Sequence, residues 1–244
     1  MFCKIADFVI EIRNKGMNFQ KLEDFCGCSE KKSDMVIKIT KDEALSEKAI
    51  SLEQDLFLGE YAVSNALRKI AEWVPLNGAF LLHSACFDVN GTGVAFAAHS
   101  GTGKTTHMRL WQQLLGDRLT IVNGDKPIVR FFDDEPETPY AYGTPWNGKE
   151  HLGCNMRTPL KHICFIERAE QNSCEPMEKG DAVNLIFDQV YMPKNPAAMV
   201  QTLQLIDRLL SCGRLWKIKC NMEPQAAEVS FGAIFGKEPA ASKI

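Results

Sequence analysis

Short strand-like runs occupy the first part of the chain and then give way to a helical spacing of hydrophobic residues. Apolar runs at 8–10 and 36–39 predict strands, and polar residues at 29–34 separate them. Over 52–72, apolar residues recur at every third or fourth position, which is the pattern of an amphipathic helix. Proline and glycine after this segment end the helix. We therefore expect residues 1–75 to form a β-rich lead-in and a helix that pack on the core.

Further along, apolar runs of strand length alternate with segments of helical periodicity. The predicted strands are 79–89, 94–98, 119–122, 127–132, 161–167 and 214–219. The predicted helices are one that follows residues 100–106 and those at 181–190, 196–211 and 225–234. Strands that alternate with helices favour an α/β fold with one main sheet. We expect residues 76–244 to form this domain.

Two of the predicted helices begin with capping signals. Asp181 is the expected N-cap of the helix at 181–190. Asn195 and Pro196 suit the N-cap and the first helical position of the helix that follows. The aliphatic stripe of this second helix fits either the core or a subunit contact, so the sequence leaves a homo-oligomer open.

The charge balance narrows the classes of partner. The 244 residues include 28 Lys and Arg against 31 Asp and Glu, a formal net charge of −3. A general nucleic-acid or membrane-surface binder needs excess positive charge, so neither is expected. No apolar run reaches the roughly 18 residues of a membrane span, and the N-terminus lacks the pattern of an export signal. The expected location is the cytoplasm.

The cysteine content also favours a location in the cytoplasm. Nine cysteines are scattered through the chain, and an odd number of this kind is typical of a reducing compartment. Only Cys26 and Cys28 lie close together, and no second pair follows at the spacing of a zinc site. We expect most of the cysteines to be small buried hydrophobic residues.

A glycine-rich segment after the strand at 94–98 carries the strongest chemical signal. It consists of Ser100, Gly101, Thr102, Gly103, Lys104, Thr105 and Thr106. Strand, glycine-rich loop, Lys-Thr and helix is the layout of a phosphate-binding P-loop. Backbone N–H groups of the loop and of the helix N-terminus would cradle a phosphate, Lys104 would reach the β- and γ-phosphates, and Thr105 would ligate Mg²⁺.

The loop departs from the usual pattern at one position. The pattern G-x-x-x-x-G-K-[ST] begins with glycine, and Ala98 stands there instead. An extended backbone at Ala98 would tolerate this change. A P-loop enzyme also needs an acid to position magnesium or to accept a proton. Asp125, at the end of the next apolar run, is the candidate, although a turn residue beside Gly124 would look the same.

From His83 to Asp125 the chain resembles HPr kinase/phosphorylase, and the loop resembles that of ATP-dependent phosphoenolpyruvate carboxykinase. The kinase family has His-Gly, an Asp and Gly-x-Gly at fixed offsets before its P-loop. The matching positions here are His83-Ser84, Asp88, Gly91, Gly93, Ser100, Gly101, Gly103, Lys104 and Thr105. The family's paired acids are reduced to one, since Gly124 precedes Asp125. Residues 143–150 and 220–224 resemble an uncharacterised bacterial group related to HPr kinase.

The resemblance implies a carboxykinase-like mixed sheet with flanking helices that binds ATP and Mg²⁺. In that family, the histidine matching His83 lies near the transferred phosphate, and an acid at the Asp125 position acts as base or metal ligand. With one acid missing, Glu150 is the candidate for a second metal ligand, although a solvated loop residue fits equally well.

Several further residues could contribute to the site. Phosphoryl transfer needs positive charge, and the candidates near the motifs are Lys126, Lys149, Arg157 and Arg168. Lys149 is favoured for the substrate because Gly148 lets its loop approach a ligand. Trp146 would either stack on a base or anchor its loop. Asp88 is expected to orient the turn at 90–93, and His99 and His107 are expected to be positional.

These residues predict a kinase that acts on a protein serine or a small-molecule hydroxyl, with ATP as donor and Mg²⁺ as cofactor; the sequence alone leaves GTP and pyrophosphate open as donors. Carboxykinase chemistry is a weaker reading, because the chain is much shorter than that enzyme. The alternative is a non-catalytic nucleotide-binding regulator or an accessory protein of a peptide-modification cassette. The altered first glycine and the missing acid favour that alternative, whereas Lys104, Thr105 and Asp125 oppose it.

Overall fold

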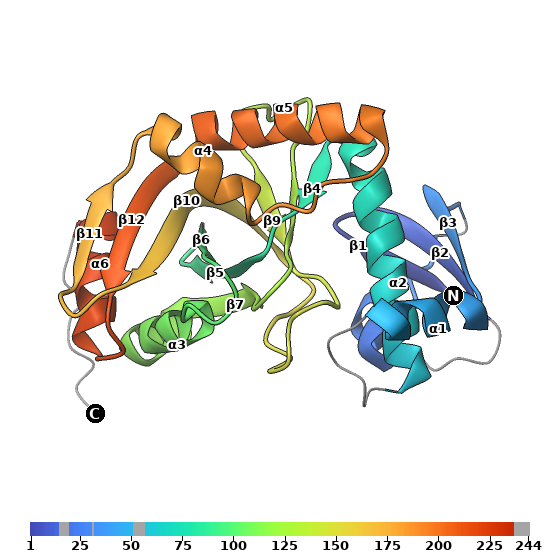
Figure 1. Cartoon of the computed structure of the whole chain (residues 1–244), viewed down its shortest axis with the longest axis horizontal. Coiled ribbons are helices and arrows are strands. Elements are labelled where there is room, and N and C mark those ends of the chain that lie inside the picture. Colours follow the sequence, from blue (N-terminus) through green and yellow to red (C-terminus); the bar gives the residue numbers. More distant parts are fainter. Residues whose placement is uncertain (15–19, 31, 51–56, 237–244) are drawn as a thin grey trace.

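The computed structural model describes residues 1–14, 20–30, 32–50 and 57–236. It is a mixed α/β structure with a three-stranded sheet near the N-terminus and a larger mixed sheet flanked by helices (Figure 1). This arrangement confirms the predicted α/β class. No helix in the described ranges is both long enough and apolar enough to cross a membrane.

The N-terminal sheet contains the two strands predicted at 8–10 and 36–39 and a further first strand that the sequence did not predict. Its strands are β1 (Phe2–Ile5), β2 (Phe8–Asn14) and β3 (Met35–Ile39), in that order, with β2 and β3 parallel. Helices α1 (Lys41–Ile50) and α2 (Leu58–Trp73) follow, and a 3₁₀ turn lies at Gln20–Phe25. The predicted helix at 52–72 therefore matches α2, although residues 52–56 lie outside the described ranges. The sequence did not predict α1.

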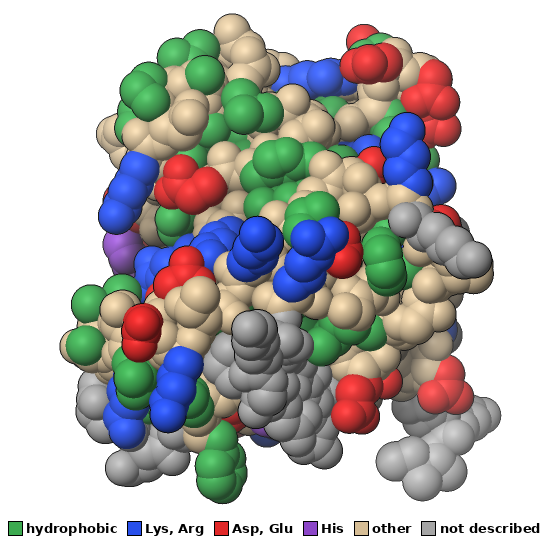
Figure 2. All heavy atoms as spheres, turned by 90° about the vertical axis from the view of Figure 1, so that its right-hand side faces the viewer, with side chains coloured by type: hydrophobic (Ala, Val, Ile, Leu, Met, Phe, Trp, Pro, Cys, Tyr) green, Lys and Arg blue, Asp and Glu red, His purple; other side chains and the backbone are tan. Residues whose placement is uncertain are grey.

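The charged side chains of this N-terminal part offset one another. Figure 2 shows Lys and Arg side chains gathered across the middle of this side of the molecule, with Asp and Glu side chains around them. Arg68 and Lys69 of α2 form ion pairs with Glu47 and Glu43 of α1. Glu47 is only 7% exposed, so its pair with Arg68 fixes one helix against the other.

The larger sheet has the order β4-β8-β9-β10-β6-β5-β7, and β12 extends it beside β10. Its strands are β4 (Ala79–Leu81), β5 (Ser84–Val89), β6 (Thr92–Ala97), β7 (Leu119–Asn123), β8 (Ile128–Arg130), β9 (Tyr140–Tyr142), β10 (Arg157–Arg168), β11 (Ser173–Pro176) and β12 (Arg214–Cys220). The strand predicted at 79–89 is two strands, because the chain leaves the sheet at Leu82 and His83. Their backbones pair instead with Val190 and Gln189.

Helices cover both faces of this sheet (Figure 1). They are α3 (Lys104–Leu115), α4 (Lys179–Phe187), α5 (Pro196–Cys212) and α6 (Gln225–Phe235), with 3₁₀ turns at Val74–Asn77 and Gly116–Arg118. Alternate residues of β6 point to opposite faces. Phe96 packs in the cluster that contains Trp111 of α3, whereas Ala97 packs in the cluster that contains Leu209 of α5.

One helix cap is confirmed and another is wrong. The Asn195 side chain accepts a hydrogen bond from the Ala198 N–H at 3.1 Å, as predicted for an N-cap. Helix α4 begins earlier than expected, so its N-cap is Glu178 and Asp181 lies in the first turn. The sequence pattern missed this because Lys179 and Gly180 carry no helical signal.

The cysteines match the expectation in part. Cys3 and Cys26 form a disulfide between β1 and the segment after the first 3₁₀ turn. Of the remaining cysteines, Cys86, Cys164 and Cys220 are buried, whereas Cys154 is exposed. The expectation of buried hydrophobic cysteines holds for Cys3, Cys86, Cys164 and Cys220 and in part for Cys26, Cys174 and Cys212, which pack against the hydrophobic clusters. The disulfide was not predicted, because positions 3 and 26 are far apart in the sequence.

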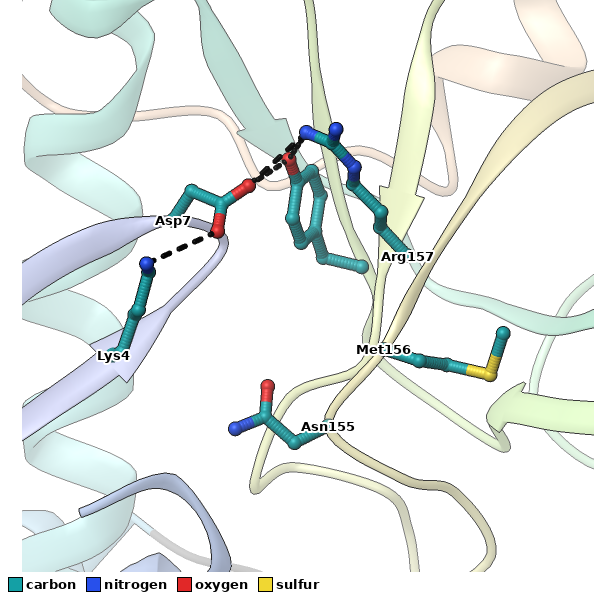
Figure 3. Close-up of a pocket in the computed structure, with 6 residues that line it drawn as sticks. Lys4, Asp7, Asn155, Met156 and Arg157 are labelled. Carbon is teal, nitrogen blue, oxygen red and sulfur yellow. Dashed lines mark hydrogen bonds and ion pairs between the residues drawn. The ribbon is translucent and has the colours of Figure 1, made fainter. Parts of the chain in front are cut away.

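A polar junction connects the N-terminal sheet to the larger one (Figure 3). Tyr142 Oη donates a hydrogen bond to Asp7 Oδ2 at 2.5 Å, and Arg157 donates to the same oxygen at 3.2 Å. Lys4 and Asn155 line the cavity of about 340 Å³ beside them. Asp7, in the turn between β1 and β2, thereby fixes β9 and β10 against the N-terminal sheet.

Two buried neutral histidines make stability depend on pH. His107 is 2% exposed and contacts Ser230 Oγ at 3.0 Å, and burial lowers its pKa to about 4. Burial, with the charge of Arg214, lowers the pKa of His162 to about 4 as well. Both pKa values lie below the ordinary value of 6.5. The contribution of the two neutral histidines to the free energy of unfolding is therefore fully present above that pH and is lost as the pH falls towards 4.

We expect the free energy of unfolding to fall by roughly 2 kcal/mol per histidine between about pH 7.5 and about pH 5. The variant His107→Gln should lose about half of this decrease, measured by urea unfolding at the two pH values. The exposed His151→Gln is the matched control and should keep the whole decrease. Equal pH dependence in all three proteins would show that His107 is not buried in its neutral form.

Candidate functional site

The glycine-rich loop lies between the end of β6 and the start of α3. Gly101 and Gly103 have φ values of 78° and 120°, which side chains with a Cβ rarely adopt. Helix α3 begins at Lys104, so its free N–H groups face the loop. Within the described part of the chain, a Cβ at either glycine would meet nothing within 4 Å. The space in front of the loop is therefore open to a ligand.

A cavity of about 250 Å³ lies at this loop. It is lined by His83, Ser100, Gly101, Gly103, Lys104, Thr105, Thr106, Gly124 and Asp125. The structure thus brings His83 and Asp125, from two other segments, to the loop that the sequence singled out. Thr102 belongs to the same loop but is not a lining residue.

Lys104 is the buried cation of the site. Its side chain is folded back along the loop, and Nζ donates a hydrogen bond to the Ala98 carbonyl at 2.7 Å. Lys104 is only 7% exposed, and this burial lowers the pKa of its ammonium, while the carboxylate of Asp125 opposes the shift. A buried ammonium at a helix N-terminus adds to the positive potential there, which favours an anion.

His83 lies between the cation and the acid. Its Nε2 is 3.3 Å from Lys104 Nζ and 3.3 Å from Asp125 Oδ1. The ring nitrogen can accept from the ammonium only when it carries no proton, and can donate to the carboxylate only when it carries one. Only one of the two contacts can therefore be a hydrogen bond of Nε2 at a time. The backbone N–H of His83 donates to the Gln189 carbonyl at 2.7 Å, which fixes the residue at the break between β4 and β5.

Asp125 follows β7 and is ionised at neutral pH. Burial raises the pKa of its carboxyl, but the hydrogen bond from His83 and the charge of Lys126 lower it more, to about 2. Lys126 Nζ contacts the second carboxylate oxygen directly. A carboxylate with so low a pKa is a weak base, because the best general bases have pKa values near the working pH. It is better suited to orient a hydrogen-bond donor or to bind a metal ion.

Asn123 and Thr144 hold Asp125 in place, and the sequence did not single them out. The Asn123 side-chain oxygen accepts hydrogen bonds from the N–H groups of Asp125 and Lys126, at 2.9 and 2.7 Å. Its amide nitrogen donates to the side-chain oxygen of Thr144 at 3.0 Å. Asn123 is fully buried, so the turn is fixed from inside the protein. Asn before Gly-Asp is a turn signal that could have identified this role.

The loop at 143–153 contacts the site with its backbone rather than with the predicted side chains. A Cβ at Gly148 would lie 3.2 Å from the Asp125 Cβ. Lys149 and Glu150 are exposed and do not line the cavity. Glu150 instead forms an ion pair with Arg109 of α3. No group of three or more potential His, Cys, Asp or Glu metal ligands occurs in the described residues.

Trp146 anchors this loop. Its indole N–H donates to the Val63 carbonyl of α2 at 3.0 Å, and the side chain is 8% exposed. Of the two interpretations, stacking on a base or anchoring, the structure favours the anchor. Asp88 accepts hydrogen bonds from Gly91 N–H and Thr158 Oγ1, at 2.8 and 2.5 Å, which confirms that it orients its turn.

The four candidate cations lie in different places. Lys126 contacts Asp125, and Arg168 contacts the glycine-rich loop. Arg157 lies in the junction with the N-terminal sheet, and Lys149 lies outside the cavity. His99 is exposed beside Asp188, with Nε2 3.6 Å from its carboxylate.

The donor set at the cavity fits a nucleoside triphosphate with Mg²⁺. Backbone N–H groups and the Lys104 ammonium are donors for phosphate oxygens, whereas the Thr105 hydroxyl and the Asp125 carboxylate are the oxygen ligands that Mg²⁺ prefers. Mg²⁺ commonly takes one or two protein ligands and fills the other positions with water and phosphate. The fit therefore does not depend on Glu150.

Comparisons with known proteins give little beyond this geometry. No family model matches the chain, and no curated protein matches it. Among solved structures, that of the Hpr(Ser) kinase/phosphatase from Coxiella burnetii aligns over 60% of this chain and 88% of that chain. The TM-score is 0.34 and the sequence identity is 8%. A structural similarity this weak does not indicate the function of this protein, which depends on the residues of the site.

Proposed function

We propose that this protein is a Mg²⁺-dependent phosphotransferase that takes the γ-phosphate from ATP. The observation that carries the proposal is the placement of the buried Lys104 ammonium, the His83 ring and the Asp125 carboxylate around one cavity at the N-terminus of α3. Catalysis of phosphoryl transfer is mainly positioning and electrostatic stabilisation, and this cavity offers both.

Each residue has a distinct task in this proposal. The N–H groups of Gly101 and Gly103 and the Lys104 ammonium bind the phosphate oxygens of ATP. Thr105 and Asp125 hold Mg²⁺, which supplies charge neutralisation at the phosphates. Asp125, ionised and fixed by Asn123, orients the acceptor hydroxyl. The acceptor oxygen bonds to the γ-phosphorus as the bond to the β-phosphate oxygen breaks and ADP leaves, and His83 Nε2 takes the proton of the hydroxyl.

The acceptor is a hydroxyl group of a protein serine or of a small molecule. To identify its class, purified protein would be incubated with Mg²⁺ and γ-labelled ATP, together with cell extract divided into protein and small-molecule fractions. The Lys104→Met variant is the control. Label that enters one fraction, and is lost with the variant, supports a kinase and names the acceptor class. Failure of the wild type to bind Mg-ATP would overturn the proposal.

A nucleotide-binding regulator is the second candidate, and one observation favours it. Asp125 is the one acid that lines the cavity within the described residues, and Glu150 is engaged with Arg109. A site that retains ATP but has lost an acid could act as a sensor in a peptide-modification cassette. Binding of ATP with no label in either fraction would support this candidate.

A further inference from the structure

Arg168, at the end of β10, contacts the glycine-rich loop from outside the cavity. Strands β6 and β10 are parallel neighbours with Ala97 opposite Phe165, so the end of β10 runs beside the beginning of the loop. The Arg168 Nε donates a hydrogen bond to the Thr102 carbonyl at 3.0 Å, and a terminal nitrogen donates to the Gly101 carbonyl. One planar guanidinium thus holds two successive carbonyls of the loop.

These contacts decide which way the peptide groups of the loop face. In a trans peptide the C=O and the following N–H point in opposite directions. With the Thr102 carbonyl fixed on Arg168, the N–H of Gly103 points the other way, and Gly103 lines the cavity. Gly101 and Gly103 allow more backbone conformations than any other residue type would. Without the guanidinium, the peptide groups of the loop are therefore free to change orientation. A flipped peptide would present a carbonyl oxygen to a phosphate and repel it.

The charged residues next to Arg168 form an ion pair with each other rather than with the loop. Glu167, the preceding residue of β10, forms an ion pair with Lys217 of β12 at 3.0 Å. Lys217 is therefore a matched control, since it is a half-buried cation on the strand beside β10 and its ion pair is with Glu167 rather than with the loop.

We propose that Arg168 is a positioning residue that keeps the N–H groups of the glycine-rich loop turned towards the phosphates of the bound nucleotide. The inference rests on the proposed function, because it assigns a task within nucleotide binding. It differs from the expectation that Arg168 meets the anionic substrate directly, since its donors face the loop carbonyls. Its effect is on nucleotide affinity, whereas His83 and Asp125 act on transfer.

The test compares Arg168→Ala, Arg168→Lys and Lys217→Ala for KM, kcat and the Kd of Mg-ATP. We expect Arg168→Ala to raise KM and Kd for ATP about tenfold, with a smaller change in kcat, because charge-assisted hydrogen bonds are lost. Arg168→Lys, which keeps one donor group, should recover part of this affinity. Free guanidinium at millimolar concentration should restore affinity to Arg168→Ala and leave Lys217→Ala unchanged, a result that a merely structural role would not give.

The outcomes separate this inference from the function on which it rests. If the wild type does not bind Mg-ATP, the proposed function fails and the inference fails with it. If the wild type binds and Arg168→Ala binds equally well, only the inference is overturned. Should Arg168→Ala not fold, Arg168→Lys decides, because a folded variant with unchanged ATP affinity also overturns the inference and one with raised KM supports it.

Discussion

Replacing Lys104 with methionine is expected to lower phosphate transfer by at least about 100-fold, the size of effect seen when one preorganised donor to a developing charge is removed. Methionine keeps the buried stem of the side chain but removes the ammonium from the N-terminus of α3. Among the described residues, Lys104 is the one lysine or arginine that lines the cavity, and the nearby Lys126 ammonium pairs with Asp125. The rate would be measured by label transfer from γ-labelled ATP, together with the Kd of Mg-ATP.

The fold should survive this substitution. Burial lowers the pKa of Lys104, so the folded protein bears a cost for keeping the ammonium in the cavity, and its removal should not reduce the free energy of unfolding. The exposed Lys161→Met, on β10, is the control for a lost surface charge and should transfer phosphate at the normal rate. If the Lys104 variant transfers phosphate normally while folded, the proposed role of the loop is wrong.

The sequence predicts those parts of the fold that carry a long periodic pattern. Helix α5 shows apolar residues at helical spacing and a cap at Asn195, and both features are found in the structure. Strands β1, β9 and β11 were missed because each has only three or four residues, too few to show an alternation. Helix α1 was missed because it buries only Ala44 and Glu47, so its sequence has little hydrophobic period.

In the candidate site too, the sequence predicts the residues of a local motif and misses those that act through contacts between distant segments. Residues 100–106 are contiguous, so the glycines and the lysine can be recognised as a phosphate-binding motif from the local sequence. The sequence named Arg168 only as one of four candidate cations and did not single out Thr144. Their roles come from contacts across the sheet, with a sequence separation of 66 residues between Arg168 and Thr102, so no local pattern reveals them. The ion pair between Glu150 and Arg109 is equally non-local, and for that reason the sequence could not show that Glu150 is engaged elsewhere.

Asp125 is the residue for which sequence and structure together give the sharpest expectation. The variant Asp125→Asn should lower phosphate transfer by at least about 100-fold and change the Kd of ATP much less, because phosphate binding depends mainly on the loop. The carbamoyl group keeps the shape of the side chain but removes a charge that pairs with both Lys126 and His83. A residual activity that needs more Mg²⁺ than the wild type would identify the lost group as a metal ligand.

The control for a lost surface carboxylate is Asp117→Asn, in the 3₁₀ turn that follows α3, which should behave as the wild type. Comparison with Asn123→Ala separates position from charge, because that variant keeps the carboxylate but removes the acceptor for the N–H groups of Asp125 and Lys126. If turnover falls in both variants, the charge must also be held in place to act. Unchanged turnover in a folded Asp125→Asn protein would remove Asp125 from the mechanism and leave binding of the nucleotide as the function of the site.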